Sequence, residues 1–256
     1  MRWFLSCYLA DAEEVGINEL QRAHSPASRS LLDRWLGIDT VDLDSAQLPP
    51  LRVEALRRFV CAQTEPVYFK VHEALKQPGS AAELLPDGIH NRVVYIVRDP
   101  RDVVLSSADF SAVSVDQAIA WLCDCDHYVP ARELGMTTEL PTSVGSWSDH
   151  LDSWTATDVL LVRYEDLHIA PLESFSRVVV HLNLAVDQGR IERAIDASRF
   201  ELASKQERRE GFVEAMPGRA FFAHGVAGRW RSELTAQQIE TIERRHESWM
   251  RKLDYL

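Results

Sequence analysis

Two short apolar runs stand out in the hydrophobic and polar pattern of this chain, RVVYIV at 92–97 and DVLLVR at 158–163. Near-continuous apolar strands are typical of a parallel sheet with helices on both faces. Elsewhere apolar residues recur at the spacing of amphipathic helices. This spacing predicts helices over 1–12, 17–22, 30–36, 49–60, 115–125, 145–156, 171–184, 188–196, 199–209 and 235–253. Strands that alternate with helices predict an α/β fold, a parallel sheet flanked by helices on both faces.

Weaker signals add a further strand, a further helix and a loop. Residues 66–71, PVYFKV, are rich in β-branched and aromatic residues and predict another strand. Asp99 followed by Pro100 predicts a helix start, with the Asp side chain as its cap. The polar stretch 203–220 is the best candidate for a mobile loop or lid. Because neither a repeat nor a linker divides the chain, we expect residues 1–256 to form a single domain.

The chain is acidic, with a formal net charge of −11. That balance argues against non-specific binding to nucleic acid or to an anionic membrane. An anionic ligand would therefore need a local cluster of positive groups. The longest apolar runs fall well short of the about 20 residues of a membrane span. We expect a cytoplasmic protein that binds neither nucleic acid nor membrane.

The four cysteines do not form the framework of a disulfide-rich protein in a chain of this length, which fits a reducing compartment. Cys123, Cys125 and His127 look at first like metal ligands. On a helix, residues two apart point in different directions, and no second Cys/His pair follows. We therefore expect no metal site.

The stretch YIVRDPRDVVLSS, residues 95–107, is the most informative one for chemistry. A buried strand would deliver Arg98 to the sheet edge where open α/β sheets bind ligands. The next helix brings its N-terminal N–H groups to the same place, and Ser106 could add a hydroxyl. These groups together predict a phosphate site. The alternative is an arginine that pairs with Asp99 or Asp102 in a plain ion-pair network.

Lys70 and His72 would lie on one face of the strand at 66–71, because alternate residues of a strand point the same way. An ammonium beside an imidazole favours the neutral form, which a general base requires. The alternative is a histidine that is merely packed or at the surface. Two further stretches are DVLLVRYEDL, which sets Tyr164 past a strand, and FFAHGVAGRWRSELT, whose glycines would let the backbone approach an anion.

Taken in order, these stretches resemble the 3′-phosphoadenylyl-sulfate-dependent sulfotransferases of the cytosolic and bacterial natural-product type. Lys70-Val71-His72 matches the family motif K-T-H, and Arg98 to Ser106 matches R-N-P-x-D-x-x-x-S with Asp99 in place of Asn. GSWSDHLDSW, residues 145–154, resembles G-S-W-x-x-H-V-x-S-W, and Arg163–Leu167 matches x-x-Y-E-D-L. The resemblance implies the sulfotransferase variant of the P-loop fold.

The resemblance also implies a role for each matched residue. His72 would be the general base, and Lys70 would stabilise charge on the transferring group. The implied nucleotide-binding residues are Arg98 and Ser106 at the 3′-phosphate, Tyr164, Ser198 and Phe200 around the adenine, and Gly225 through its backbone N–H. Trp147 and His150 would border the pocket for a small-molecule hydroxyl acceptor. 3′-Phosphoadenylyl sulfate would be the cosubstrate, without a metal.

One departure from the family pattern concerns its last motif, R-K-G-x-x-G-x-W. Here Ala223-His224-Gly225 replaces R-K-G, so one phosphate-binding arginine is missing, and Arg219 or Arg229 could compensate. Arg231 begins a loose version of the family's dimer motif, which makes a homodimer possible.

The larger departure from the family pattern is at the start of the chain. Members of the family begin with a strand and a phosphosulfate-binding loop, Y-P-K-S-G-x-T-W, and MRWFL resembles the residues directly after it. We therefore expect an N-terminally truncated sulfotransferase domain without its first strand and loop. The alternative function is a non-catalytic nucleotide-binding remnant or partner protein. A nucleotide kinase is a weaker option, because G-x-x-x-x-G-K-[ST] does not occur.

Overall fold

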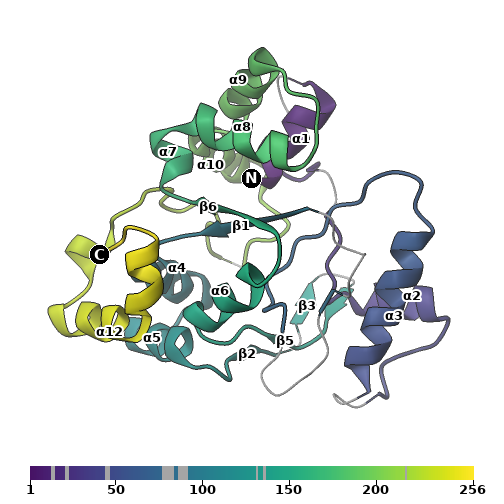
Figure 1. Cartoon of the computed structure of the whole chain (residues 1–256), viewed down its shortest axis with the longest axis horizontal. Helices are drawn as coiled ribbons and strands as arrows, with labels where there is room; N and C mark the ends of the chain where they lie inside the picture. Colours follow the sequence, from purple (N-terminus) through teal and green to yellow (C-terminus); the bar gives the residue numbers. More distant parts are fainter. Residues whose placement is uncertain are drawn as a thin grey trace. The chain divides into compact units, whose positions relative to one another are not determined.

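The computed structural model describes residues 1–12, 15–20, 23–43, 47–76, 84–85, 92–130, 132–134, 137–216 and 218–256. The chain falls into two compact units, each built from separate stretches of sequence (Figure 1). The first unit comprises Met1–Arg22, Arg92–Ile119 and Val159–Leu256. The second unit comprises Ala23–Asn91 and Ala120–Asp158. That all 256 residues act as a single domain stays a prediction.

The two apolar runs are the strands of the first unit. β1 (Val93–Val97) and β6 (Val159–Arg163) pair in parallel, and the register runs from Val93 opposite Val159 to Val97 opposite Arg163. In Figure 1 helices lie on either side of this pair, α8 and α10 on one side and α4 and α12 on the other. The predicted α/β class with parallel strands is confirmed.

Helices make up most of the first unit, and all those predicted from spacing in this unit except 17–22 are present. The helices of the unit are α1 (Arg2–Ala10), α4 (Pro100–Ser111), α7 (Asp166–Ile169), α8 (Pro171–His181), α9 (Gln188–Ala197), α10 (Phe200–Glu210), α11 (Trp230–Glu233) and α12 (Ala236–Lys252). α5 (Val115–Cys123) begins in the first unit and ends in the second. The side chain of Asp99 caps α4 by accepting a hydrogen bond from the Arg101 N–H, as predicted.

The apolar opening of the chain forms the core of the first unit. Phe4 is fully buried and stacks on Phe175 of α8, with ring centroids 4.0 Å apart. Trp3, Cys7 and Tyr8 belong to the same buried cluster. α1 is therefore held by packing against α8 and α9, although its N-cap Met1 offers no side-chain hydrogen bond.

The second unit combines helices with short antiparallel strands that the apolar pattern did not predict. Its helices are α2 (Arg29–Leu36), α3 (Leu48–Cys61) and α6 (Trp147–Thr155). β2 (Tyr128–Val129) pairs with β5 (Thr142–Ser143), and β3 (Arg132–Leu134) pairs with β4 (Thr137–Glu139). Strands of two or three residues are too short to show alternation in the sequence.

Over the residues that the structure describes, two predictions were wrong and a third was wrong in part. Residues 17–20 form turns, and the buried Ile17 N–H donates to the side chain of Gln206 at 2.9 Å rather than within a helix. The strand at 66–71 is reduced to one bridge between Phe69 and His24. In the predicted lid 203–220, residues 203–210 continue α10.

The prediction of a loop holds for the second half of this stretch, because the described residues 211–216 and 218–220 lie outside any helix, and its mobility stays a prediction. The carboxylate of Glu207 accepts hydrogen bonds from the N–H groups of Phe221, at 2.6 Å, and Phe222, at 2.9 Å. These two bonds connect the chain just after the loop to α10. Among the described residues, no helix is both long and apolar enough to cross a membrane.

Candidate functional site

Arg98 lies directly after β1, beside the start of α4. Its Nη2 donates to the carbonyl oxygen of Val226 at 2.8 Å and lies 3.7 Å from Oδ2 of Asp102. Its guanidinium carbon lies 4.6 Å from the centre of the Tyr164 ring. Its Nε is buried and has no hydrogen-bond partner among the described residues. Because an unsatisfied buried donor is costly, an anion at this nitrogen would be stabilising.

Asp102, in the first turn of α4, fixes the segment 226–230 beside Arg98. Its side chain is 1% exposed. Its two oxygens accept hydrogen bonds from the N–H groups of Gly228, at 2.5 Å, and Trp230, at 3.1 Å. Since Arg98 also bonds to Val226, the segment is held at both of its ends.

Arg101 also stabilises the segment 226–230, through its contact with Trp230. Its guanidinium forms two close hydrogen bonds with Asp99, from Nε at 2.9 Å and from Nη2 at 2.7 Å. Nη1 donates to Glu243 of α12 at 2.5 Å, and the guanidinium carbon lies 3.7 Å from the Trp230 ring. Asp99 is thus paired with Arg101. Of the two ion-pair partners considered for Arg98, the structure places Asp102 beside it.

Gly225 lies against Phe200, the first residue of α10. Its φ is +63°, and a Cβ there would meet the Phe200 ring at 2.4 Å. A side chain at position 225 would both strain the backbone and displace the ring. The close approach therefore requires glycine.

The remaining predicted nucleotide residues, Ser106, Tyr164 and Ser198, also lie in the first unit, and Ser106 is an exposed residue of α4. The Tyr164 N–H donates to the carbonyl oxygen of Val97 at 2.7 Å, which places the ring at the end of β1. Burial raises the pKa of Tyr164, and the nearby Arg98 opposes that rise. Ser198 ends α9, two residues before Phe200. The structure thus brings together Arg98 with Tyr164 and Gly225 with Phe200.

The arginines considered as substitutes for the residue at Ala223 both contact Asp109 of α4. Arg229 Nη1 lies 3.0 Å from Oδ2 of Asp109, and Arg219 donates to the Asp109 carbonyl oxygen. His224 Nε2 lies 3.5 Å from the same Oδ2. Three residues with basic side chains therefore converge on one carboxylate-bearing residue.

Lys70 and His72 lie in the second unit, on an extended segment rather than a regular strand. The Lys70 N–H donates to the carbonyl oxygen of His24 at 2.9 Å. Lys70 is half-buried, and His72 is exposed. That these two side chains share one face is a prediction from strand alternation. The single bridge between Phe69 and His24 does not test it.

The backbone just after His72 is firmly anchored. Glu73 is 2% exposed, and its carboxylate accepts hydrogen bonds from Arg52 at 3.3 and 2.8 Å. Its carbonyl oxygen accepts from Trp154 Nε1 at 2.9 Å. The Leu75 N–H donates to Ser153 Oγ at 3.1 Å. α3 and α6 thereby fix the chain next to the predicted base.

His150 of α6 hydrogen-bonds to the backbone of both His72 and Glu73, and burial lowers its pKa. Trp147, the first residue of α6, is half-buried. Both belong to the second unit, as do Lys70 and His72. All six predicted nucleotide residues, by contrast, belong to the first.

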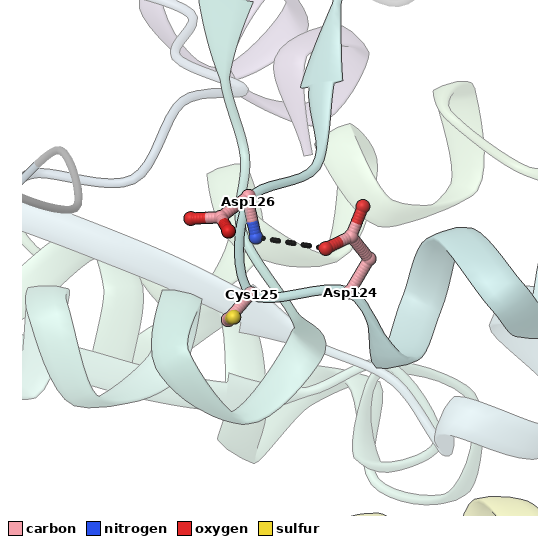
Figure 2. A group of neighbouring side chains, drawn as sticks. All are labelled: Asp124, Cys125 and Asp126. Atoms are coloured by element: carbon pink, nitrogen blue, oxygen red, sulfur yellow. Dashed lines mark hydrogen bonds between the residues drawn. The ribbon is translucent and has the colours of Figure 1, made fainter.

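The structure offers a possible metal-binding group at Asp124, Cys125 and Asp126 (Figure 2). All three residues are exposed, and Asp124 Oδ1 accepts a hydrogen bond from the Asp126 N–H at 2.9 Å. This turn uses the carboxylate to stabilise the backbone, as Asp commonly does. Exposed acidic residues in such a turn do not by themselves indicate a metal.

A shallow hollow of about 580 Å³ lies elsewhere in the first unit. Its lining residues include Leu160 of β6 and Val180 of α8, but none of the predicted site residues. Its walls are mainly apolar. We therefore place the candidate site at Arg98 and the segment 226–230 rather than here.

Sequence reasoning missed the acidic residues that organise the site. Asp102 was considered only as a partner of Arg98, and Asp109 was not considered. Glu165 was also missed; it accepts hydrogen bonds from the Asp99 N–H at 3.1 Å and from the Tyr255 hydroxyl at 2.8 Å. The signal was the spacing of 102, 106 and 109, which puts three polar residues on one helix face.

Comparison with known proteins identifies the family. The family model for the sulfotransferase domain matches residues 25–254. Rat sulfotransferase 2B1 is 27% identical over 184 residues, 63% of this chain and 48% of the relative. Arabidopsis thaliana cytosolic sulfotransferase 13 is 26% identical over 193 residues, 71% and 57% respectively. The chain spans about half the length of the curated relatives it matches, and these relatives are eukaryotic.

Solved structures share the fold. Mouse sulfotransferase SULT7A1, complexed with PAP, has a TM-score of 0.56 at 18% identity, covering 77% of this chain and 70% of its own. Retinol dehydratase in complex with retinol and PAP has a TM-score of 0.57 at 18% identity, covering 86% and 61%. Together with the motifs that the first unit and the second unit each carry, the domain match over residues 25–254 shows that this chain belongs to the sulfotransferase family.

Proposed function

We propose that the protein transfers a sulfonate group from 3′-phosphoadenylyl sulfate to a hydroxyl of a small molecule. The observation that carries the proposal is Arg98, a guanidinium at the end of β1 whose buried Nε has no partner among the described residues. Family membership adds the reaction class. Mouse SULT7A1 solved with PAP, and retinol dehydratase solved with PAP and either retinol or androsterone, support the nucleotide and an apolar hydroxyl acceptor.

The first unit would bind the nucleotide. Arg98 and Ser106 would bind the 3′-phosphate, and Gly225 would offer its N–H, because guanidinium, hydroxyl and backbone N–H are the usual phosphate donors. Glycine at position 225 also allows the Phe200 ring, proposed to contact the adenine, to pack directly against this backbone. Tyr164, Ser198 and Phe200 would surround the adenine, a task for which aromatic rings are suited.

The second unit would supply the chemistry. The acceptor oxygen attacks sulfur, the bond from sulfur to the 5′-phosphate oxygen breaks, and the acceptor proton passes to the His72 imidazole. Lys70 would stabilise the charge that develops on the leaving phosphate. The imidazole and the ammonium together account for the proton and the charge of this step. Trp147 and His150 would border the acceptor, and His150 would in addition hold the backbone of His72.

The test uses the whole chain in two measurements. Calorimetry with adenosine 3′,5′-bisphosphate measures nucleotide affinity, and transfer of labelled sulfonate from 3′-phosphoadenylyl sulfate to hydroxysteroid or retinol-like alcohols measures activity. We expect His72→Ala to lower turnover by about 10²–10⁴-fold with unchanged nucleotide affinity. Arg98→Ala should weaken nucleotide binding by about 1.5–3 kcal/mol.

The outcomes separate the alternatives. Full turnover in His72→Ala would refute its role as the base. Nucleotide binding without any transfer would favour the non-catalytic nucleotide-binding protein. If the wild-type chain does not bind adenosine 3′,5′-bisphosphate, the proposed function is wrong. Size-exclusion chromatography with light scattering tests the possible homodimer separately.

A further inference from the structure

The face of α4 that carries Ser106 also carries an acidic residue one turn to either side. Asp102, Ser106 and Asp109 are spaced by four and three residues, so their side chains lie along one face of the helix. Asp102 binds the backbone N–H groups of the segment 226–230, and Asp109 binds the side chain of Arg229. The segment therefore contacts α4 through one residue on either side of Ser106, at Asp102 and at Asp109.

Arg229 is more buried than the two carboxylates that hold it. Its side chain is 14% exposed, against 50% for Asp109 and 41% for Glu233. Its Nε and Nη2 donate to Glu233 at 2.8 and 2.9 Å, and its Nη1 donates to Asp109 at 3.0 Å. Asp109 is half-exposed, so its carboxylate can accept from water once this bond breaks, whereas the largely buried Arg229 Nη1 needs another acceptor in its place.

We propose that Arg229 is a further anion-binding residue of this site and that Asp109 is the carboxylate which the incoming phosphate displaces. The inference rests on the proposed function, in which a nucleotide 3′-phosphate binds at Arg98 and Ser106. A phosphate offers Arg229 Nη1 the same kind of charged acceptor that Asp109 offers now. Asp109 then acts against binding in two ways, because it occupies the cation and repels the anion across one helical turn.

Arg229 is favoured over Arg219 for a structural reason. Arg219 reaches Asp109 only through the backbone carbonyl oxygen, which bears no full charge. Arg229 makes the side-chain ion pair, and its backbone lies between Gly228 and Trp230, both held by Asp102. Its position beside α4 is therefore fixed at the backbone, while the bond from Nη1 to Asp109 can be exchanged.

The test compares two nucleotides by calorimetry on the whole chain: adenosine 3′,5′-bisphosphate and adenosine 5′-monophosphate, which lacks the 3′-phosphate. Asp109→Asn should bind the bisphosphate at least threefold more tightly and leave the monophosphate unchanged. Arg229→Gln should bind the bisphosphate about tenfold more weakly, again without changing the monophosphate. Glu233→Gln, which removes the other carboxylate, should act in the same direction as Asp109→Asn.

Matched controls come from α12, where Arg251 and Glu247 form an exposed ion pair of the same spacing as Arg229 and Glu233. Arg251→Gln and Glu247→Gln should change neither affinity. Weaker or unchanged bisphosphate binding in Asp109→Asn would overturn the inference, as would equal losses for both nucleotides in Arg229→Gln. Loss in Arg219→Gln but not in Arg229→Gln would also overturn it. A wild-type chain that binds no bisphosphate would refute the proposed function as well, so the two failures are distinguishable.

Discussion

The two units hold their candidate site residues in opposite ways. In the first unit the charged side chains hold one another: Arg98 lies between Val226, Asp102 and the Tyr164 ring. In the second unit His72 is exposed, and the structure instead fixes the neighbouring backbone, through Glu73 in particular.

Each arrangement suits the task proposed for it, which is anion binding in the first unit and proton transfer in the second. Charged groups that are balanced by nearby charges can exchange partners when an ion arrives, as anion binding requires. Buried hydrogen bonds that anchor the backbone also fix the position of the Cα atom next to them. An exposed side chain such as His72 then samples fewer positions, which favours proton transfer in one geometry. Breaking an anchor in each unit should therefore have different consequences.

The largest effect is expected at the buried anchor of the second unit. Glu73→Gln leaves Arg52 as an unpaired charge whose side chain is only 6% exposed, which should lower the free energy of unfolding by about 3–5 kcal/mol. Glu54→Gln breaks the exposed pair with Arg58 and should cost only about 0.3–0.5 kcal/mol. Urea unfolding followed by tryptophan fluorescence measures both. Similar losses in the two variants would show that the buried pair is not the anchor.

A smaller effect is expected at Gly225 in the first unit. Gly225→Ala combines a left-handed backbone, about 1–2 kcal/mol, with a clash against the Phe200 ring, so it should lower both stability and nucleotide affinity. Gly37→Ala is the matched control, because φ there is +71° with nothing within 4 Å of the added Cβ. It should lower stability by the backbone cost alone. Equal thermal shifts, with nucleotide affinity retained in Gly225→Ala, would contradict the close packing on Phe200.

The smallest effect concerns pH and sharpens the role of His150. Burial lowers its pKa in the folded protein below the unfolded value of about 6.5. Below that pH the unfolded chain binds a proton that the folded chain resists, so stability falls as pH falls, by at most about 1.4 kcal/mol per pH unit for this group. His150→Gln should flatten the decline between pH 7.5 and 5.5 in urea unfolding.

Other histidines also contribute to the fall in stability at low pH. Burial also lowers the pKa values of His24, His127 and His168. A residual decline in His150→Gln is therefore expected. An unchanged slope would mean that protonation of His150 does not limit stability in acid.

Prediction from the sequence succeeded where local pattern decides the structure. The apolar runs that form β1 and β6, the Asp99 cap of α4 and the helix α12 each follow from residues that are close together in the chain. It failed at residues 66–71, where β-propensity produced only one bridge, because a strand needs a partner that propensity cannot supply.

The candidate site likewise contains residues that local motifs predicted and partners that they did not. Motifs singled out Arg98, Ser106, Gly225, Lys70 and His72, each from its own short stretch of sequence. Which acidic residue accompanies each cation could not be predicted, because the partners are distant in the chain. Asp102 meets Gly228 across 126 residues, and Asp109 meets Arg229 across 120 residues.

Residue type and short spacing along the chain predicted the family, most of the strands and helices, and a set of candidate site residues, because these depend on local pattern. Only the tertiary structure decided that Asp102 holds the segment 226–230, that Asp109 occupies Arg229 and that Glu73 is bound by Arg52. Carboxylates and guanidinium groups take whichever partner the packed elements bring within hydrogen-bonding distance, and short-range sequence pattern does not carry that information.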